Sequence, residues 1–160
     1  MPKELLLIID KPIIQYAVEE AIAAGITELV FITGRTKRAI EDHFDANPEL
    51  ERELHEKGRD DVIATVRGII PDHVNCVFIR QPRPLGLGHA VLCGALVIGR
   101  APFAVLLADD IVKGTPSPTA ELIAGFERTG HTQNSVMDVA LSELSKYGII
   151  RPDDTLVFAT

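Results

Sequence analysis

The chain has 160 residues, of which 46% are hydrophobic and 24% are charged, so it is long enough to bury one core and we expect a single domain over residues 1–160. Its formal net charge of -7 argues against a nucleic acid or an anionic membrane as the main partner, because both would require a basic face. A small phosphorylated ligand stays compatible with this charge, since a helix amino terminus and one Mg²⁺ ion can hold phosphates locally. No apolar run reaches the roughly 18 residues of a membrane helix, and the amino terminus lacks the pattern of a signal peptide, so we expect a cytoplasmic protein.

Apolar periodicity and turn residues predict helices that alternate with strands. In the first half we expect a helix that starts near Pro12 and ends at Gly25, a strand at 29–32, a helix from about Thr36, and helical segments at 48–58 and 60–70. In the second half we expect a strand near 75–79, a helix with Val91, Ala95 and Ile98 on one side, a strand at 103–107, a helix at 119–128, and strands at 135–141 and 147–150. Such alternation predicts a Rossmann-like α/β fold, with a mostly parallel sheet flanked by helices.

Three of the predicted strands run directly into polar residues. The residues that follow them are Thr33, Gln81 and Asp109. Ligands of open parallel sheets bind outside the carboxyl ends of the strands, so these three residues are the first candidates for chemistry. We expect the Gln81 amide, the backbone at Gly86 and the Asp109 carboxylate to share one concave rim.

The loop from Gln81 to His89 is the most specific local pattern. Prolines at 82 and 84 restrict its backbone, whereas Gly86 and Gly88 leave room for a planar ligand to lie against the chain. The Gln81 side chain offers both an acceptor and a donor, which suits the imide edge of a uracil or thymine ring. A strand-to-helix turn whose glycines allow tight packing explains the same pattern, and from the residues alone both interpretations stay open.

Asp109 and Asp110 follow the third apolar strand. Adjacent residues of extended backbone point in opposite directions, so we expect one of the two to face the crevice, where a single carboxylate with phosphate oxygens and waters is a common Mg²⁺ arrangement. An aspartate at a strand end also often caps the next turn, and that alternative stays open. For Thr33 the pattern favours a cap before a helix over a phosphate contact. Lys3 by itself is typical of a solvated charge, and Gly148 carries no signal in isolation.

Short motifs follow one another in a fixed order over nearly the whole chain. They read Pro-Lys-Glu-Leu-Leu at 2–6, Asp-Lys-Pro-Ile-Ile-Gln-Tyr at 10–16, Ala-Ala-Gly-Ile-Thr-Glu at 23–28, Ile-Glu-Asp-His-Phe-Asp at 40–45, Arg-Gln at 80–81, Gly-Leu-Gly-His-Ala-Val at 86–91, Leu-Ala-Asp-Asp at 107–110 and Tyr-Gly at 147–148. In order and spacing these motifs resemble the bacterial UTP-glucose-1-phosphate uridylyltransferases, which belong to the sugar-nucleotide nucleotidyltransferase superfamily. The Gly-Leu-Gly-His-Ala-Val stretch between Arg-Gln and the strand-end aspartate is the most specific of them.

The resemblance implies a role for five residues. Gln81 and Gly86 would read the uracil base, Asp109 would coordinate the catalytic Mg²⁺, Gly148 would lie against the glucosyl ring, and Lys3 would stand near the phosphates. The family reaction joins UTP and glucose 1-phosphate to give UDP-glucose and pyrophosphate, by in-line attack of the sugar phosphate on the α-phosphorus without a covalent enzyme intermediate. Such catalysis depends on alignment and charge neutralisation. A homo-oligomer of the kind found in the family is compatible with the sequence.

The chain also departs from the family pattern. Members carry a first strand and a Gly-x-Gly-Thr-Arg loop before the Pro-Lys-Glu motif, and a Glu-Lys-Pro motif and a second metal-binding aspartate beyond the position of Thr160; Leu7 here replaces a usual proline. We therefore expect a partial nucleotidyltransferase domain with little or no uridylyltransferase activity by itself. Two other functions stay open: a non-catalytic nucleotide-binding or interaction module, and a nucleotidyltransferase for another sugar phosphate, such as a thymidylyltransferase.

Overall fold

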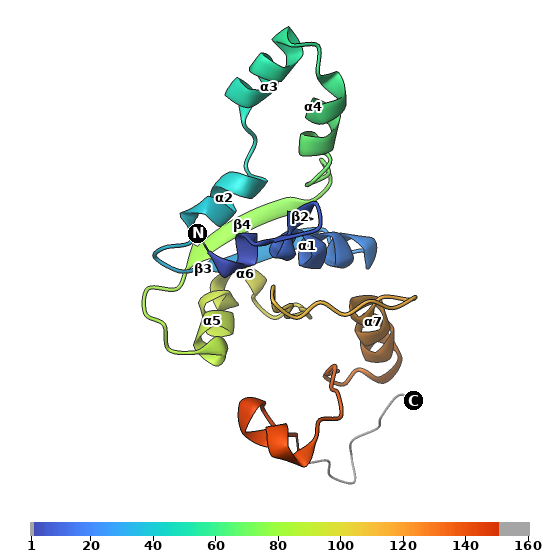
Figure 1. The fold of residues 1–160 in the computed structure, drawn as a ribbon. Coiled ribbons are helices and arrows are strands. Elements are labelled where there is room, and N and C mark those ends of the chain that lie inside the picture. Colours follow the sequence, from blue (N-terminus) through green and yellow to red (C-terminus); the bar gives the residue numbers. More distant parts are fainter. Residues whose placement is uncertain (1, 151–160) are drawn as a thin grey trace.

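A pair of parallel strands lies at the centre of the molecule (Figure 1). The computed structural model describes residues 2–150, and in it β3 (Glu28–Thr33) pairs with β4 (Asn75–Arg80) over six positions, from Glu28 opposite Asn75 to Thr33 opposite Arg80. Both strands carry an uninterrupted apolar run, which is typical of parallel strands covered on both faces. The strands predicted at 29–32 and 75–79 are thereby confirmed, and so is the α/β fold class with a parallel sheet and flanking helices.

Aromatic side chains hold α2 (Arg38–Phe44) against this sheet. Phe31 of β3 stacks on Phe78 of β4 with ring centroids 4.9 Å apart, and Phe44 of α2 lies at the same 4.9 Å from Phe31. Ring pairs of this kind stabilise a core beyond the area that they bury. Ile40 is buried on the same helix, so the face of α2 that carries Ile40 and Phe44 packs on the sheet.

The amino-terminal region combines a predicted helix with a hairpin that was not predicted. α1 (Ile13–Ala23) buries Ile14, Val18 and Ala21, which repeat at helical spacing, and the chain turns at Gly25 with a φ of 90°. Before it lie a 3₁₀ turn, η1 (Lys3–Leu5), and an antiparallel pair of two-residue strands, β1 (Leu7–Ile8) and β2 (Lys11–Pro12). Strands this short, one of them ending in a proline, leave no periodic signal in the sequence.

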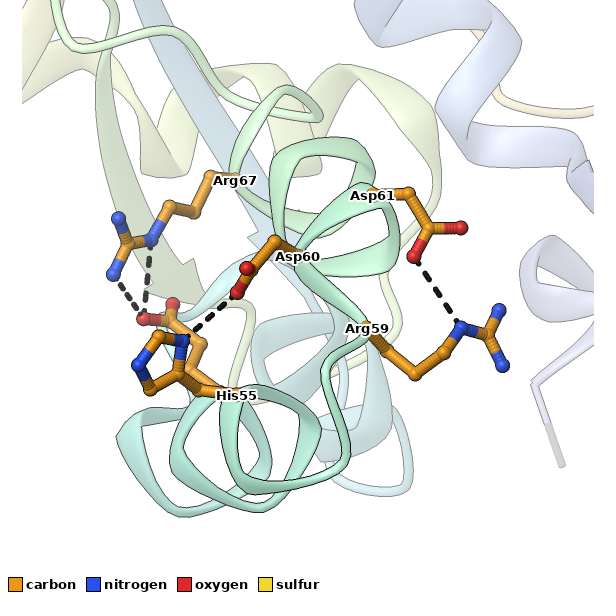
Figure 2. Close-up of polar contacts among 6 residues, drawn as sticks. His55, Arg59, Asp60, Asp61 and Arg67 are labelled. Atoms are coloured by element: carbon orange, nitrogen blue, oxygen red, sulfur yellow. Dashed lines mark hydrogen bonds and ion pairs between the residues drawn. The ribbon is translucent and has the colours of Figure 1, made fainter.

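A helical hairpin of α3 (Pro48–Glu56) and α4 (Asp60–Arg67) extends from the sheet (Figure 1) and confirms the helical segments predicted at 48–58 and 60–70. Polar contacts lie on the surface of this hairpin (Figure 2). Arg67 binds Glu51, and the His55 ring lies 2.8 Å from Asp60. Arg59 lies 3.3 Å from Asp61. Because most of these side chains are exposed, each contact contributes little to stability.

The segment after β4 forms two short helices where one was predicted. α5 (Leu87–Cys93) ends at Gly94, and α6 (Ala95–Ile98) follows directly. A Cβ at Gly94 would lie 3.1 Å from the Ile98 side chain and 3.8 Å from Ile32 of β3, so the break allows this point of the chain to pack closely on the sheet. The later helix, α7 (Pro118–Thr129), is confirmed and is capped by Ser117, whose side chain accepts from the backbone N–H of Ala120.

Three predicted strands are wrong. The segments 103–107, 135–141 and 147–150 form no strand in the described structure, and between the last two lies a 3₁₀ turn, η2 (Leu141–Lys146). A strand exists only with a hydrogen-bonded neighbour, and no such neighbour lies beside these segments within residues 2–150. As a result Phe103 and Val105 are 57% and 51% exposed. No helix in the same range is both long and apolar enough to cross a membrane.

Candidate nucleotide-binding site

The carboxyl ends of β3 and β4 lie side by side. The backbone N–H of Gln81 donates to the carbonyl oxygen of Thr33 at 2.8 Å. Thr33 itself is 3% exposed, and its hydroxyl donates to the Glu41 carboxylate of α2 at 3.1 Å. The predicted capping role of Thr33 is wrong in detail, because Lys37 immediately precedes α2 and Thr33 binds that helix from its side. Gln81 is left at the edge of the sheet.

The turn after β4 brings the Gln81 side chain back onto its own loop. The Nε2 of Gln81 donates to the carbonyl oxygen of Gly86 at 3.1 Å and lies 2.9 Å from Nδ1 of His89 in α5. Gly86 has a φ of 91° and a ψ of -179°, a conformation that is essentially restricted to glycine. No atom lies within 4 Å of the position that a Cβ at Gly86 would take, so this backbone is open to a ligand. The structure therefore brings Gln81 and Gly86 together.

A second contact joins Lys3 to Asp109, 106 positions away. The Nζ of Lys3 donates to a carboxylate oxygen of Asp109 at 2.5 Å, and both side chains are partly exposed. This hydrogen bond and the charge of Asp109 raise the pKa of Lys3, and the same hydrogen bond lowers the pKa of Asp109. Asp109 is therefore an ionised carboxylate at neutral pH, which is the form that a divalent cation needs.

An ion pair that the sequence did not reveal lies beside Lys3. The Lys37 ammonium donates to the Glu4 carboxylate at 2.5 Å, and Glu4 is 7% exposed. Burial by itself would raise the pKa of the Glu4 carboxyl, but the hydrogen bond from Lys37 and further favourable contacts outweigh burial, so that the pKa is lowered. Together with Pro2, Lys3 and Thr36, the pair lines an open pocket of about 410 Å³. The one signal was the Pro-Lys-Glu motif, which contains Glu4.

The two aspartates after the third apolar segment have different surroundings. Asp109 contacts Lys3, whereas Asp110 lines a cavity of about 600 Å³ with Tyr16, Glu19 and Glu20 of α1. That Asp109 is the one of the two that faces a ligand stays a prediction. No group of three or more metal-binding side chains occurs within the described range 2–150, so Asp109 would need water and ligand oxygens to complete a metal site.

The remaining candidate does not join either contact. Gly148 follows η2, and no atom lies within 4 Å of the position of its Cβ. The described residues also show no direct hydrogen bond between the Gln81–Gly86 turn and the Lys3–Asp109 pair. The site thus consists of two separate contacts, one suited to a base and one suited to phosphates and a cation. The shared rim expected for Gln81, Gly86 and Asp109 stays a prediction.

An amide and a glycine turn at the carboxyl edge of a parallel pair define an α/β protein with a candidate ligand site where such sheets bind nucleotides. A sequence profile described as nucleotidyl transferase matches residues 1–158. The chain belongs to this family.

Within this family, the chain is similar to UTP-glucose-1-phosphate uridylyltransferases, which are also named UDP-glucose pyrophosphorylases. The chain is 48% identical over 152 residues to a UTP-glucose-1-phosphate uridylyltransferase of Bacillus subtilis, a match that covers 95% of this chain and 52% of the relative. It superposes on an apo UDP-glucose pyrophosphorylase with a TM-score of 0.82 at 42% identity, over 94% of this chain and 56% of that one. A UDP-glucose pyrophosphorylase complexed with UDP-glucose gives 0.81 at 39% identity, over 98% and 57%. The chain therefore spans about half the length of the proteins that it matches.

Proposed function

We propose that this chain is a nucleotidyltransferase domain that takes part in the reaction of UTP with glucose 1-phosphate to give UDP-glucose and pyrophosphate. The observation that carries the proposal is the contact between Gln81 and Gly86, in a chain 48% identical to a protein named for that reaction. The turn offers the amide oxygen of Gln81 and the open backbone of Gly86 to one edge of a planar base. Gln81 and Gly86 are thus the proposed uracil-binding residues.

Lys3 and Asp109 are the proposed catalytic residues, with Asp109 as a ligand of Mg²⁺. The donor chemistry fits, because an ionised and partly exposed carboxylate can share a magnesium ion with phosphate oxygens and waters. When bound, Mg²⁺ would neutralise charge on the phosphates of UTP. The Lys3 ammonium lies beside the same carboxylate, so its positive charge would stabilise the negative phosphates of a nucleotide bound there.

The proposed reaction needs no covalent bond to the protein. An oxygen of the glucose 1-phosphate phosphate group attacks the α-phosphorus of UTP in line, and the bond from that phosphorus to the β-phosphate oxygen breaks as pyrophosphate leaves. The contribution of this chain is alignment of the nucleotide by Gln81 and Gly86 and charge stabilisation by Lys3. Gly148 is proposed to lie against the glucosyl ring, where the absence of a side chain permits close approach. Because the substrates are phosphorylated metabolites of the cell interior, we place the protein in the cytoplasm, with a homo-oligomer compatible.

Turnover by the 160-residue chain alone is proposed to be low. Asp109 follows an extended segment that has no strand partner among the described residues, so its carboxylate is held by Lys3 and by a local turn. Catalytic groups lose efficiency steeply when their positions vary by an ångström. The same observation favours a second candidate, a nucleotide-binding module that does not catalyse the reaction.

Two measurements on the full chain test these proposals. Calorimetric titration with UTP and Mg²⁺ should show binding that Gln81→Ala weakens roughly tenfold, whereas Gln133→Ala, which removes an amide near the end of α7, should leave it unchanged. Asp109→Asn should abolish the dependence of UTP affinity on Mg²⁺. Absence of UTP binding by the wild-type chain at millimolar nucleotide would overturn the proposed function.

The second measurement is pyrophosphate release from UTP, glucose 1-phosphate and Mg²⁺. Slow release that Asp109→Asn removes favours the enzyme, and binding without any release favours the non-catalytic module. Turnover as fast as that of a full-length relative would contradict the proposal of low activity. Titration with dTTP beside UTP separates uridylyl from thymidylyl specificity, because the two bases share the imide edge and differ in the methyl group.

A further inference from the structure

His89 contacts the Gln81 amide in the candidate site. It lies in α5, three positions after Gly86, and its Nδ1 is 2.9 Å from Nε2 of Gln81. The Sγ of Cys93 lies 3.9 Å from the same nitrogen and can donate only weakly to it. His89 is half-buried, and its ring contacts the Gln81 amide.

The carbonyl oxygen of Gly86 decides how the Gln81 amide is oriented. A carbonyl oxygen can only accept, and it lies 3.1 Å from Nε2 of Gln81, so the amide must present an N–H there. Rotating the amide by half a turn would place its oxygen against the Gly86 oxygen, which is repulsive. The second N–H of the same amide is then directed to His89, whose Nδ1 must accept. An accepting Nδ1 corresponds to the imidazole tautomer that carries its proton on Nε2.

We infer that His89 is a positioning residue that locks the Gln81 amide with its oxygen toward the ligand, and thereby selects a base that carries an N–H donor at that edge. Both amide protons are occupied by Gly86 and His89, and no donor among residues 2–150 contacts the Gln81 oxygen. The inference rests on the proposed function, in which Gln81 reads the base. Uracil and thymine present an imide N–H at ring position 3, whereas cytosine presents an acceptor nitrogen there, which would meet the amide oxygen unfavourably. The preference for uracil over cytosine should be roughly tenfold or more.

A matched pair of variants separates positioning from packing. His89→Leu keeps an apolar side chain in α5 but removes the acceptor, so the Gln81 amide is free to turn and present an N–H to cytosine. His89→Asn returns an acceptor oxygen close to the place of Nδ1. We expect His89→Leu to reduce the ratio of UTP to CTP affinity severalfold and His89→Asn to keep most of it. Far-ultraviolet circular dichroism and thermal unfolding establish that both variants fold.

Nuclear magnetic resonance on the free, ¹⁵N-labelled chain tests the same inference without a nucleotide. Long-range proton–nitrogen correlation should show Nδ1 of His89 unprotonated and Nε2 protonated at neutral pH, and the Gln81 side-chain amide signals should move in His89→Leu and return in His89→Asn. A protonated Nδ1, unmoved Gln81 signals, or an unchanged UTP to CTP ratio in His89→Leu would each overturn the inference. If the wild-type chain binds neither nucleotide, the proposed function fails, and the resonance result alone decides whether His89 orients Gln81.

Discussion

Lys37 and Glu4, 33 positions apart in the sequence, form an ion pair that joins the start of α2 to η1, with 2.5 Å between nitrogen and oxygen. Glu4 is buried, and one of its oxygens, Oε2, is buried without a hydrogen-bond partner in the described structure. Because η1 also carries Lys3, this pair anchors the turn from which Lys3 reaches Asp109. A contact that contributes to stability therefore also supports the candidate catalytic pair.

Replacing Lys37 by Met should destabilise the chain at neutral pH by about 1 to 3 kcal/mol, because a buried carboxylate would lose its compensating cation. Urea unfolding followed by circular dichroism measures this free energy. Lys57→Met is the matched control: Lys57 pairs with Glu53 on the exposed surface of α3, where such a pair contributes about 0.5 kcal/mol or less. Equal effects of the two substitutions would contradict the inference that the buried Glu4 depends on its cation more than the exposed Glu53 does.

The penalty of Lys37→Met should depend on pH. Since the pKa of Glu4 is lowered in the folded chain, the stabilising contribution of the pair is complete above the ordinary value of 4.5 and is lost as the pH falls through the folded pKa. The unfolding free energies of wild type and Lys37→Met should therefore converge below pH 4.5. A difference that stays constant down to strongly acidic pH would show that Lys37 acts by packing and not by charge.

Glu20 of α1 should contribute to stability by holding the first turn of α7. One of its carboxylate oxygens accepts from the backbone N–H of Thr119 at 3.0 Å and from the Thr119 hydroxyl at 2.6 Å. Thr119 is buried, so Glu20→Ala leaves two donors unpaired and should cost about 1 to 3 kcal/mol in urea unfolding. Glu127→Ala, at an exposed position of α7, should change stability by about 0.5 kcal/mol or less. Equal losses of stability in Glu20→Ala and Glu127→Ala would contradict the inference that Glu20 holds α7 against α1.

His43 should make the chain less stable in mild acid. Burial lowers the pKa of His43 below 6.5, so the unfolded chain takes up this proton more readily than the folded one. Its stabilising contribution is complete above pH 6.5 and decreases as the pH falls toward the folded pKa. His43→Asn, which cannot take up the proton, should show a smaller loss of unfolding free energy between neutral pH and mild acid than wild type does. Identical pH slopes would contradict this.

Local patterns predicted most of the helices and both strands of the parallel pair, β3 and β4, because amphipathic periodicity and apolar runs are properties of neighbouring residues. The apolar run from Phe103 to Leu107 has the same strand propensity, yet it forms no strand, since pairing depends on a neighbour that the run itself does not specify. The hairpin before α1 shows the opposite error: its strands exist but were not predicted, because they are too short to show a period.

In the candidate site, too, the sequence predicts local features but not contacts between distant residues. Glycines and prolines reveal the turn from Gln81 to Gly86, because backbone freedom at a turn is a local property. Nothing local links Lys3 with Asp109, and only the resemblance to a known family placed them at one site. The orientation of Gln81 by His89 depends on which atoms meet across the turn, and the sequence specified the residues without specifying that contact.

Two glycines, one in the Gln81–Gly86 turn and one in α5, should respond in opposite ways to the same substitution. Gly86 has a φ of 91° with extended ψ, so Gly86→Ala should destabilise the chain by about 1 to 3 kcal/mol through backbone strain, with no steric clash, and should weaken UTP binding by turning the carbonyl away from Gln81. Gly88 lies in the first turn of α5, where an added Cβ meets no atom within 4 Å, so Gly88→Ala should stabilise the helix by about 0.5 kcal/mol. Thermal unfolding and UTP titration of both variants check this. Equal stability of the Gly86→Ala and Gly88→Ala chains would show that the backbone at Gly86 does not require a glycine conformation. The position of the Gly86 carbonyl oxygen would then not be fixed, and the orientation of the Gln81 amide could not be inferred from it.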